Sequence, residues 1–159
     1  MSVLGELAAV ELERAIAALR ALWIQLRGEA RVPLRSAFSP ELLKPWLPNI
    51  VIVEAVGTPP PRFRVRLAGT AVVRLAGRDF TDKFLDDLIP PEQYEVTVAP
   101  YVRAIAAGVP MEDDILNHQF IAPDGISLPV RRPVLPCSSD GVRIDRFVVR
   151  LFLYRPESR

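Results

Sequence analysis

The chain begins with a helical pattern of apolar positions. Residues 3–27 contain no proline, and their one glycine lies near the start. Apolar residues recur at spacings of three and four, which places them in one stripe along a helix; they are Leu12, Ile16, Leu19, Trp23 and Leu26. Gly28 then favours termination. The pattern predicts an amphipathic helix longer than a small domain needs, so we expect its first half to project or to pair with another surface.

Two segments further along have the pattern of strands. Residues 49–56 carry apolar side chains at both parities, which is typical of a central strand covered on both faces. Residues 62–67 alternate strictly between arginine and apolar side chains, so one face of this strand is polar and the other faces the core. The turn between them is rich in glycine and proline, and we therefore expect a hairpin.

The middle of the chain returns to helical patterns. N-cap residues, prolines and glycines divide it into three predicted helices over residues 70–76, 81–88 and 91–107. Pro100 lies inside the third, where it predicts a kink. An earlier short helix is predicted over residues 40–44, because a capping serine is followed by proline at the first helical position.

The last fifty residues alternate again as strands do. Runs near 112–121, 127–136 and 142–154 are separated by Pro-Asp-Gly and Ser-Ser-Asp-Gly, both of which have turn chemistry. The order is thus helix, two strands, several short helices and three strands. Because the short helices cannot each serve a parallel crossover, this order favours an α+β fold with an antiparallel sheet.

Composition limits the classes of protein that remain. The chain has 159 residues, half of them hydrophobic and a quarter charged, which fits one globular domain. Twenty basic and nineteen acidic residues give a formal charge of +1, so we expect no nucleic acid and no membrane as partner. One cysteine and one histidine exclude a disulfide framework and most metal centres, and no metal site is predicted.

The N-terminus has no signal of targeting. It carries three glutamates and no early basic residue, the opposite of a secretory leader. The longest uninterrupted apolar run, residues 15–19, is far too short to span a bilayer. The single Cys137 fits a reducing compartment. We therefore expect a cytoplasmic protein.

Several short motifs resemble the PAS domain superfamily. The most specific are Arg-Leu-Ala-Gly-Thr at residues 66–70 and Gly-Arg-Asp at residues 77–79. Weaker matches begin at residue 22, and the resemblance extends to about residue 154. Within the superfamily the chain resembles a family of small bacterial PAS-like proteins that occur as stand-alone domains. The order of predicted elements agrees with this resemblance.

The resemblance implies a PAS-like five-stranded antiparallel sheet with short helices on one face and an N-terminal helical extension. Residues 29–159 would form this domain and residues 1–28 the extension. The implied role is sensing or protein interaction, without a catalytic motif. The cofactor stays unknown, because members of this fold bind haem, flavin, metabolites or nothing. PAS domains often dimerise through such an extra helix, so we expect a homodimer, and any effector would be a separate protein. The predicted dimerisation residues are Leu12, Ile16, Leu19 and Trp23; whether this helix dimerises or packs on its own sheet stays open.

Arg132 is the most informative candidate for ligand binding. It shares strand parity with Val130 and Val134 and so interrupts an apolar face. A buried guanidinium needs a partner. That partner is either an internal carboxylate, such as Asp86 or Asp87, or the carboxylate or phosphate of a ligand.

Aromatic residues are the next candidates. Tyr94 and Tyr101 are seven residues apart, two helical turns, and therefore lie on one face of their helix. Together with Phe84 they could line a cavity between the helices and the sheet, where this fold holds ligands. The alternative is that the same residues simply fill the core.

The single imidazole and the single thiol are weaker candidates. His118 shares a partly apolar strand face with Phe120, and it could bind a ligand or be a satisfied core histidine. Cys137 lacks the position and sequence context of a flavin-adduct cysteine and is expected to be a small apolar residue. The acids at residues 112–114 and 86–87 are expected to be solvated ends of a strand and a helix.

These observations lead to a non-enzymatic sensory or regulatory module that binds a small molecule in its core cavity and signals through protein contacts. One alternative is a ligand-free protein-interaction module. The other is a small pocket enzyme, but the sequence offers no triad or paired constellation for it. No catalytic residue is therefore predicted.

Overall fold

The computed structural model describes residues 6–112, 119–121 and 127–154. The helices are α1 (Ala9–Arg27), α2 (Pro40–Leu43), α3 (Thr70–Ala76), α4 (Leu85–Leu88) and α5 (Pro91–Ala107), with 3-10 helices η1 (Arg35–Ala37) and η2 (Lys44–Asn49). The strands are β1 (Glu6–Leu7), β2 (Ile50–Val56), β3 (Arg62–Ala68), β4 (Gln119–Ile121), β5 (Ser127–Arg131), β6 (Val134–Cys137), β7 (Arg146–Arg150) and β8 (Phe152–Tyr154).

The strands form two four-stranded sheets whose members alternate along the chain. Their orders are β3-β2-β7-β6 and β1-β8-β5-β4. β5 leads into β6 through Arg132 and Pro133, and β7 leads into β8 through Leu151. With these junctions counted as bends in continuous strands, the order becomes β3, β2, β7/β8, β5/β6, β4, and all neighbours are antiparallel. The predicted α+β fold with an antiparallel sheet is confirmed.

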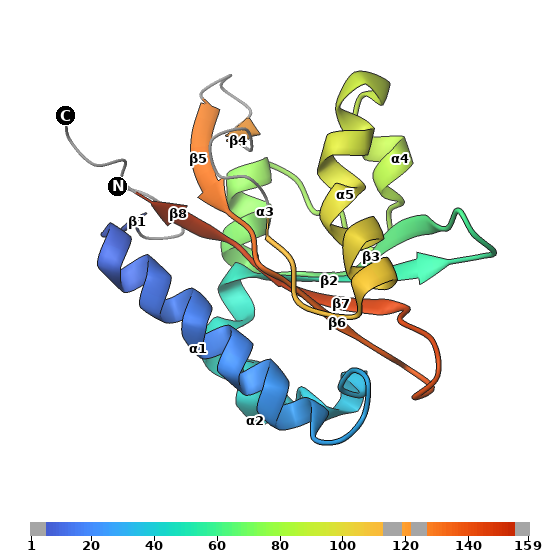
Figure 1. Ribbon diagram of the computed structural model, residues 1–159. Coiled ribbons are helices and arrows are strands. Elements are labelled where there is room, and N and C mark those ends of the chain that lie inside the picture. Colours follow the sequence, from blue (N-terminus) through green and yellow to red (C-terminus); the bar gives the residue numbers. More distant parts are fainter. Residues whose placement is uncertain (1–5, 113–118, 122–126, 155–159) are drawn as a thin grey trace.

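The sheet is covered on both sides, as Figure 1 shows: α1 lies on one side and α3, α4 and α5 lie on the other. β2 is buried over most of its length, as expected for a central strand. Its alternate residues face opposite layers, with Val51 and Val53 toward the α3–α5 side. The fold therefore has two cores, one on each face of the sheet.

The start of α1 differs from the prediction. The helix begins at Ala9 rather than near residue 3, and Ala8 offers no side-chain cap. The preceding Glu6 and Leu7 instead pair in parallel with β8. Sheet pairing satisfies the backbone groups of these two residues, and the helix starts only after it.

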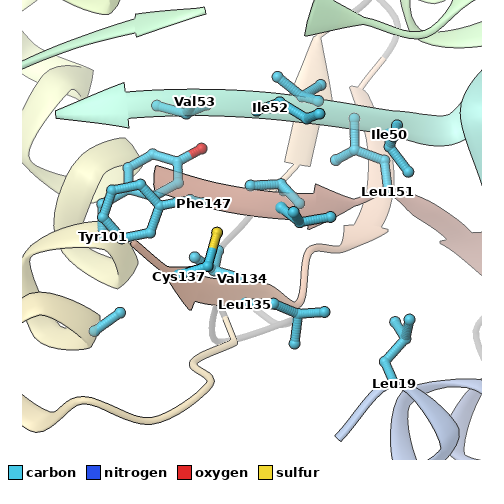
Figure 2. Packing of buried hydrophobic residues seen from close by; sticks show 14 of the residues in the cluster. Leu19, Ile50, Ile52, Val53, Tyr101, Val134, Leu135, Cys137, Phe147 and Leu151 are labelled. Atoms are coloured by element: carbon cyan, nitrogen blue, oxygen red, sulfur yellow. The ribbon is translucent and has the colours of Figure 1, made fainter. Parts of the chain in front are cut away.

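The apolar stripe of α1 is buried within the chain, the packing on its own sheet that the sequence had left open beside dimerisation. The predicted dimerisation residues are only 1–3% exposed; they are Leu12, Ile16, Leu19 and Trp23. Trp23 Nε1 donates to the carbonyl of Pro136 in β6 at 2.7 Å. Leu19 lies in the same buried cluster as Leu135 of β6, and both residues are labelled in Figure 2. These side chains pack against their own sheet and do not present an exposed stripe to a second copy.

The segment before α4 also differs from the prediction. Only Leu85–Leu88 of the expected 81–88 helix are helical. Asp82 has a φ of +67°, which a right-handed helix does not allow. The backbone there pairs with β3 instead: Asp82 N donates to Val65 O at 2.7 Å, and Val65 N donates to Lys83 O at 2.9 Å. These bonds cover the open edge of β3.

Candidate functional site

A cavity of about 460 Å³ lies between the sheet and helices α3, α4 and α5. Its floor is formed by β2, β3 and β7, and its roof by residues that α3, α4 and the segments beside them contribute. Most of its wall is aliphatic; these residues include Val51, Val53, Val65, Val72, Leu85, Leu88, Ile89, Val149 and Leu151. An apolar cavity of this size is typical of a small-molecule site.

Arg132, the leading sequence candidate for ligand binding, lines this cavity. It is 7% exposed, and its guanidinium donates to the carbonyl of Thr97 in α5 at 2.6 Å. It also lies 5.4 Å from the centre of the Tyr101 ring, within cation–π range. A charged group is thus held at the wall of a largely apolar chamber.

The carboxylates suggested as partners of Arg132 are engaged elsewhere. Asp86 accepts two hydrogen bonds of 2.7 Å from Arg62, and Asp87 lies 3.5 Å from the same guanidinium. That pairing holds the pKa of Asp86 below its ordinary value, chiefly through the side-chain hydrogen bond from Arg62. Asp86 and Asp87, the two acids that the sequence offered as examples of an internal partner, thus bind the arginine of β3 instead.

Tyr101 lines the same cavity and is almost fully buried. Its ring centre lies 5.3 Å from that of Phe63 and 5.1 Å from that of Phe147. Figure 2 shows Tyr101 reaching from α5 toward Phe147. The ring is fixed by both neighbours, so Tyr101 serves the core and the cavity wall together.

Tyr94 does not share this cavity with Tyr101, contrary to the prediction. It lines a second cavity, of about 790 Å³, between the other side of α5 and the loops at residues 57–61 and 142–145. Seven residues are slightly less than two full helical turns, so Tyr94 and Tyr101 differ by a small angle around the axis of α5. The boundary between the two cavities runs along this face of the helix. Burial, and secondarily the charge of Asp86, raises the pKa of the Tyr94 hydroxyl.

Phe84 lines neither cavity. The guanidinium carbon of Arg62 lies 3.8 Å above its ring, and that of Arg64 lies 5.7 Å away. Phe84 also forms an isolated bridge with Arg64 of β3. Its ring is covered by the arginines of the hairpin, which sequence patterning had placed only on a polar face.

The single imidazole and the single thiol are the remaining candidates. His118 lies outside the described residues. Cys137 is fully buried at the end of β6, and burial raises the pKa of its thiol to about 12. Among the described residues, no cluster of histidine, cysteine and acids is suited to a metal ion.

The sequence did not identify the other polar residues of the cavity wall, which are Arg78, Gln93 and Thr97. Gln93 and Thr97 lie one turn apart on α5, and Thr97 lies four residues before Tyr101. That spacing of four from Tyr101 was the available signal. Arg78 directly follows Gly77, which ends α3 with a φ of +78°.

Two charge clusters were also missed. Buried Glu54 of β2 binds Arg64 and lies 3.2 Å from Arg146, its direct cross-strand neighbours. Glu112, expected to be solvated, instead pairs with Arg131 and lies 3.3 Å from Arg20. An acid inside an otherwise apolar strand was the signal at Glu54. Glu112 gave none, because its partners are distant in sequence.

The comparison with protein families identifies the class. Residues 12–136 match the PAS domain family, which is most of the chain. The protein belongs to the PAS domain family, and its fold is that of a sensory signalling module. No curated protein matches the sequence.

Two solved structures are similar in fold. One is the light state of the blue-light photoreceptor Aureochrome1 LOV, with 18% identity, a TM-score of 0.49, and coverage of 71% of this chain and 86% of that one. The other is an RNA-binding Light-Oxygen-Voltage receptor, with 15% identity and a TM-score of 0.47. That match covers 76% of this chain and 34% of the receptor, about a third of its length.

No helix among the described residues combines the length and the apolar character needed to cross a membrane.

Proposed function

We propose that this PAS domain is a sensory module that binds a small, largely apolar molecule with one anionic group in the cavity beneath α3, α4 and α5. The observation that carries this proposal is the cavity itself, an aliphatic chamber of about 460 Å³ with the buried guanidinium of Arg132 at its wall. Cavities of roughly 300–1,000 Å³ suit metabolites and drug-sized ligands.

The aliphatic and the cationic residues of the lining would bind different parts of the ligand. The aliphatic wall would hold the body of the ligand by excluding water from both surfaces. Of the described residues that line the cavity, Arg78 and Arg132 are cationic and none is acidic. Arg78 is exposed and Arg132 is buried. A carboxylate or phosphate would be attracted to this positive field, and a planar guanidinium can bind it with two parallel hydrogen bonds.

Tyr101 would supply contact area rather than chemistry. Its ring is held between Phe63 and Phe147, so little conformational entropy would be lost when a ligand packs on it. Tyr94 and Phe84 are left out of this site, because they face other surroundings. The signal would leave through contacts with a separate effector protein, and no enzymatic step is proposed.

Native mass spectrometry tests the proposal directly. Protein purified without denaturation is compared with its denatured mass, and a co-purified ligand of a few hundred daltons is expected. The mass should be lost in Arg132→Ala and retained in Arg143→Ala, a matched control in an exposed loop. A protein without ligand under all purification conditions would favour the ligand-free interaction module.

A comparison of two probe molecules tests the role of the Arg132 guanidinium. Decanoate and decan-1-ol have the same apolar chain and differ only in the charged group. Decanoate should raise the melting temperature of the wild-type protein more than decanol does, because ligand binding to the native state stabilises it. Arg132→Ala should remove that difference. Equal effects of both probes on the wild type would contradict the role of the guanidinium.

A further inference from the structure

Two consecutive arginines connect the cavity with α1. Arg132 binds the carbonyl of Thr97 in α5, on the cavity side of the sheet. Arg131 binds Glu13 of α1 and Glu112. Both arginines are buried, with 8% and 7% of their surfaces exposed. Neighbouring side chains in an extended chain point to opposite faces, so the two guanidinium groups lie in different layers.

The cluster around Arg131 joins the first half of α1 to the rest of the domain. Arg131 Nε donates to Glu112 at 3.0 Å, and a second nitrogen binds Glu13. Arg20, two helical turns after Glu13, lies 3.3 Å from the same Glu112. Two α1 residues on one face therefore depend on the position of Arg131 and Glu112.

The backbone between the two layers is held firmly on both sides of the arginine pair. Val130 and Arg131 pair with β8, while Val134 pairs with β7. Arg132 and Pro133 belong to neither strand, and Pro133 restricts its own φ. Because one planar peptide group joins Arg131 to Arg132, a rotation of that plane between the two held strands redirects both side chains.

We infer that the Arg131–Arg132 pair is a relay between the cavity and α1. This inference rests on the proposed function for its input: a ligand anion that draws Arg132 away from Thr97 would tilt Arg131 and weaken its bonds to Glu13 and Glu112. The first half of α1 then opens more often and becomes the part of the surface that an effector senses. Linkage requires the reverse effect too, so changes at Glu13 alter the surroundings of Arg132.

Hydrogen exchange of the unliganded protein tests the relay without knowledge of the ligand. Glu13 is 65% exposed, so Glu13→Gln leaves the core intact. We expect exchange in residues 93–101 of α5 to become roughly twofold to fivefold faster, the effect of losing a partly exposed ion pair. Glu11→Gln removes the same charge from an exposed position on the same helix and should leave that segment unchanged.

The reverse experiment measures hydrogen exchange in α1 after a substitution at the cavity. Arg132→Met keeps the length of the side chain and removes its charge, and it should accelerate exchange in residues 9–20, whereas Arg143→Met should not. The relay is overturned if residues 93–101 of Glu13→Gln exchange at the wild-type rate. It is also overturned if residues 9–20 of Arg132→Met exchange at the wild-type rate. If both cross-effects appear but native mass spectrometry finds no ligand, the relay stands and the proposed ligand fails. If a ligand binds and neither appears, the relay alone fails.

Discussion

The two faces of the sheet are built differently from similar side chains. On one face a single long helix, α1, lays an unbroken stripe along the strands, and its residues such as Trp23 are 1% exposed. On the other face α3, α4 and the segment between them leave a cavity of about 460 Å³ beside α5. A regular stripe can mesh with a sheet to native density, whereas short helices joined by turns cannot all approach it closely. Packing stabilises the first face, and the second keeps room for a ligand.

The largest expected effect comes from removing Trp23, which anchors α1 to its face of the sheet. Trp23→Ala should lower the free energy of unfolding by about 3–5 kcal/mol, because it leaves a cavity and frees the carbonyl of Pro136. Urea unfolding measures the change. Ile24→Ala is the control, since Ile24 is 55% exposed and should cost less than about 0.5 kcal/mol.

Trp23→Phe separates the two contributions if the alanine variant does not fold. It keeps a ring and removes the indole N–H, so it should cost about 1–3 kcal/mol for the unpaired buried carbonyl. A Trp23→Ala variant as stable as Ile24→Ala would show that the packing of α1 does not stabilise its face of the sheet.

A matched pair of substitutions on β7 compares the two faces directly. Val148 and Val149 are adjacent, and both are almost fully buried, but only Val149 lines the cavity. Val148→Ile should cost about 1–3 kcal/mol by overpacking. Val149→Ile has space for the added methyl group and should cost less than about 0.5 kcal/mol.

Both variants keep a β-branched side chain, so strand propensity does not differ between them. Equal losses in urea unfolding would mean that the cavity face is as tightly packed as the other. A reduced affinity for decanoate in Val149→Ile alone would locate the probe in the cavity.

The smallest expected effect concerns the tether of α4, which forms part of the roof of the cavity. The pKa of Asp86 is lowered by its hydrogen bond from Arg62, so its contribution to stability is present above its ordinary pKa and is lost as the pH falls through the lower, folded value. Asp86→Asn should shift the urea midpoint slightly at pH 7, with the shift disappearing once the pH falls below the lowered folded pKa of Asp86, where the wild-type carboxylate is protonated too.

Asp87→Asn serves as the control, because Asp87 is 71% exposed and lies 3.5 Å from Arg62. A pH-independent difference between Asp86→Asn and the wild type would indicate that packing, rather than the ion pair, holds α4.

Local patterns identified much of the fold. The hairpin of β2 and β3, the α3 and α5 helices and the stripe of α1 all follow from periodicity and turn residues. The patterns were wrong where a tertiary contact overrode them: residues 6–7 joined β8, and residues 82–83 paired with β3. The polar interruption at Arg132 marked a buried arginine that lines the cavity, and the sequence left open whether a carboxylate of the chain or a ligand anion binds it.

The sequence by itself determined most of the elements, the order in which they form a PAS fold and the unusual position of Arg132, since these depend on short-range spacing and residue type. The tertiary structure decided which surfaces those elements share. It turned the α1 stripe inward, separated Tyr94 from Tyr101 on the two sides of α5, and brought Arg131 to Glu13 across 118 positions of sequence. Such choices depend on how whole layers pack and where charges can find partners, and no local pattern records either.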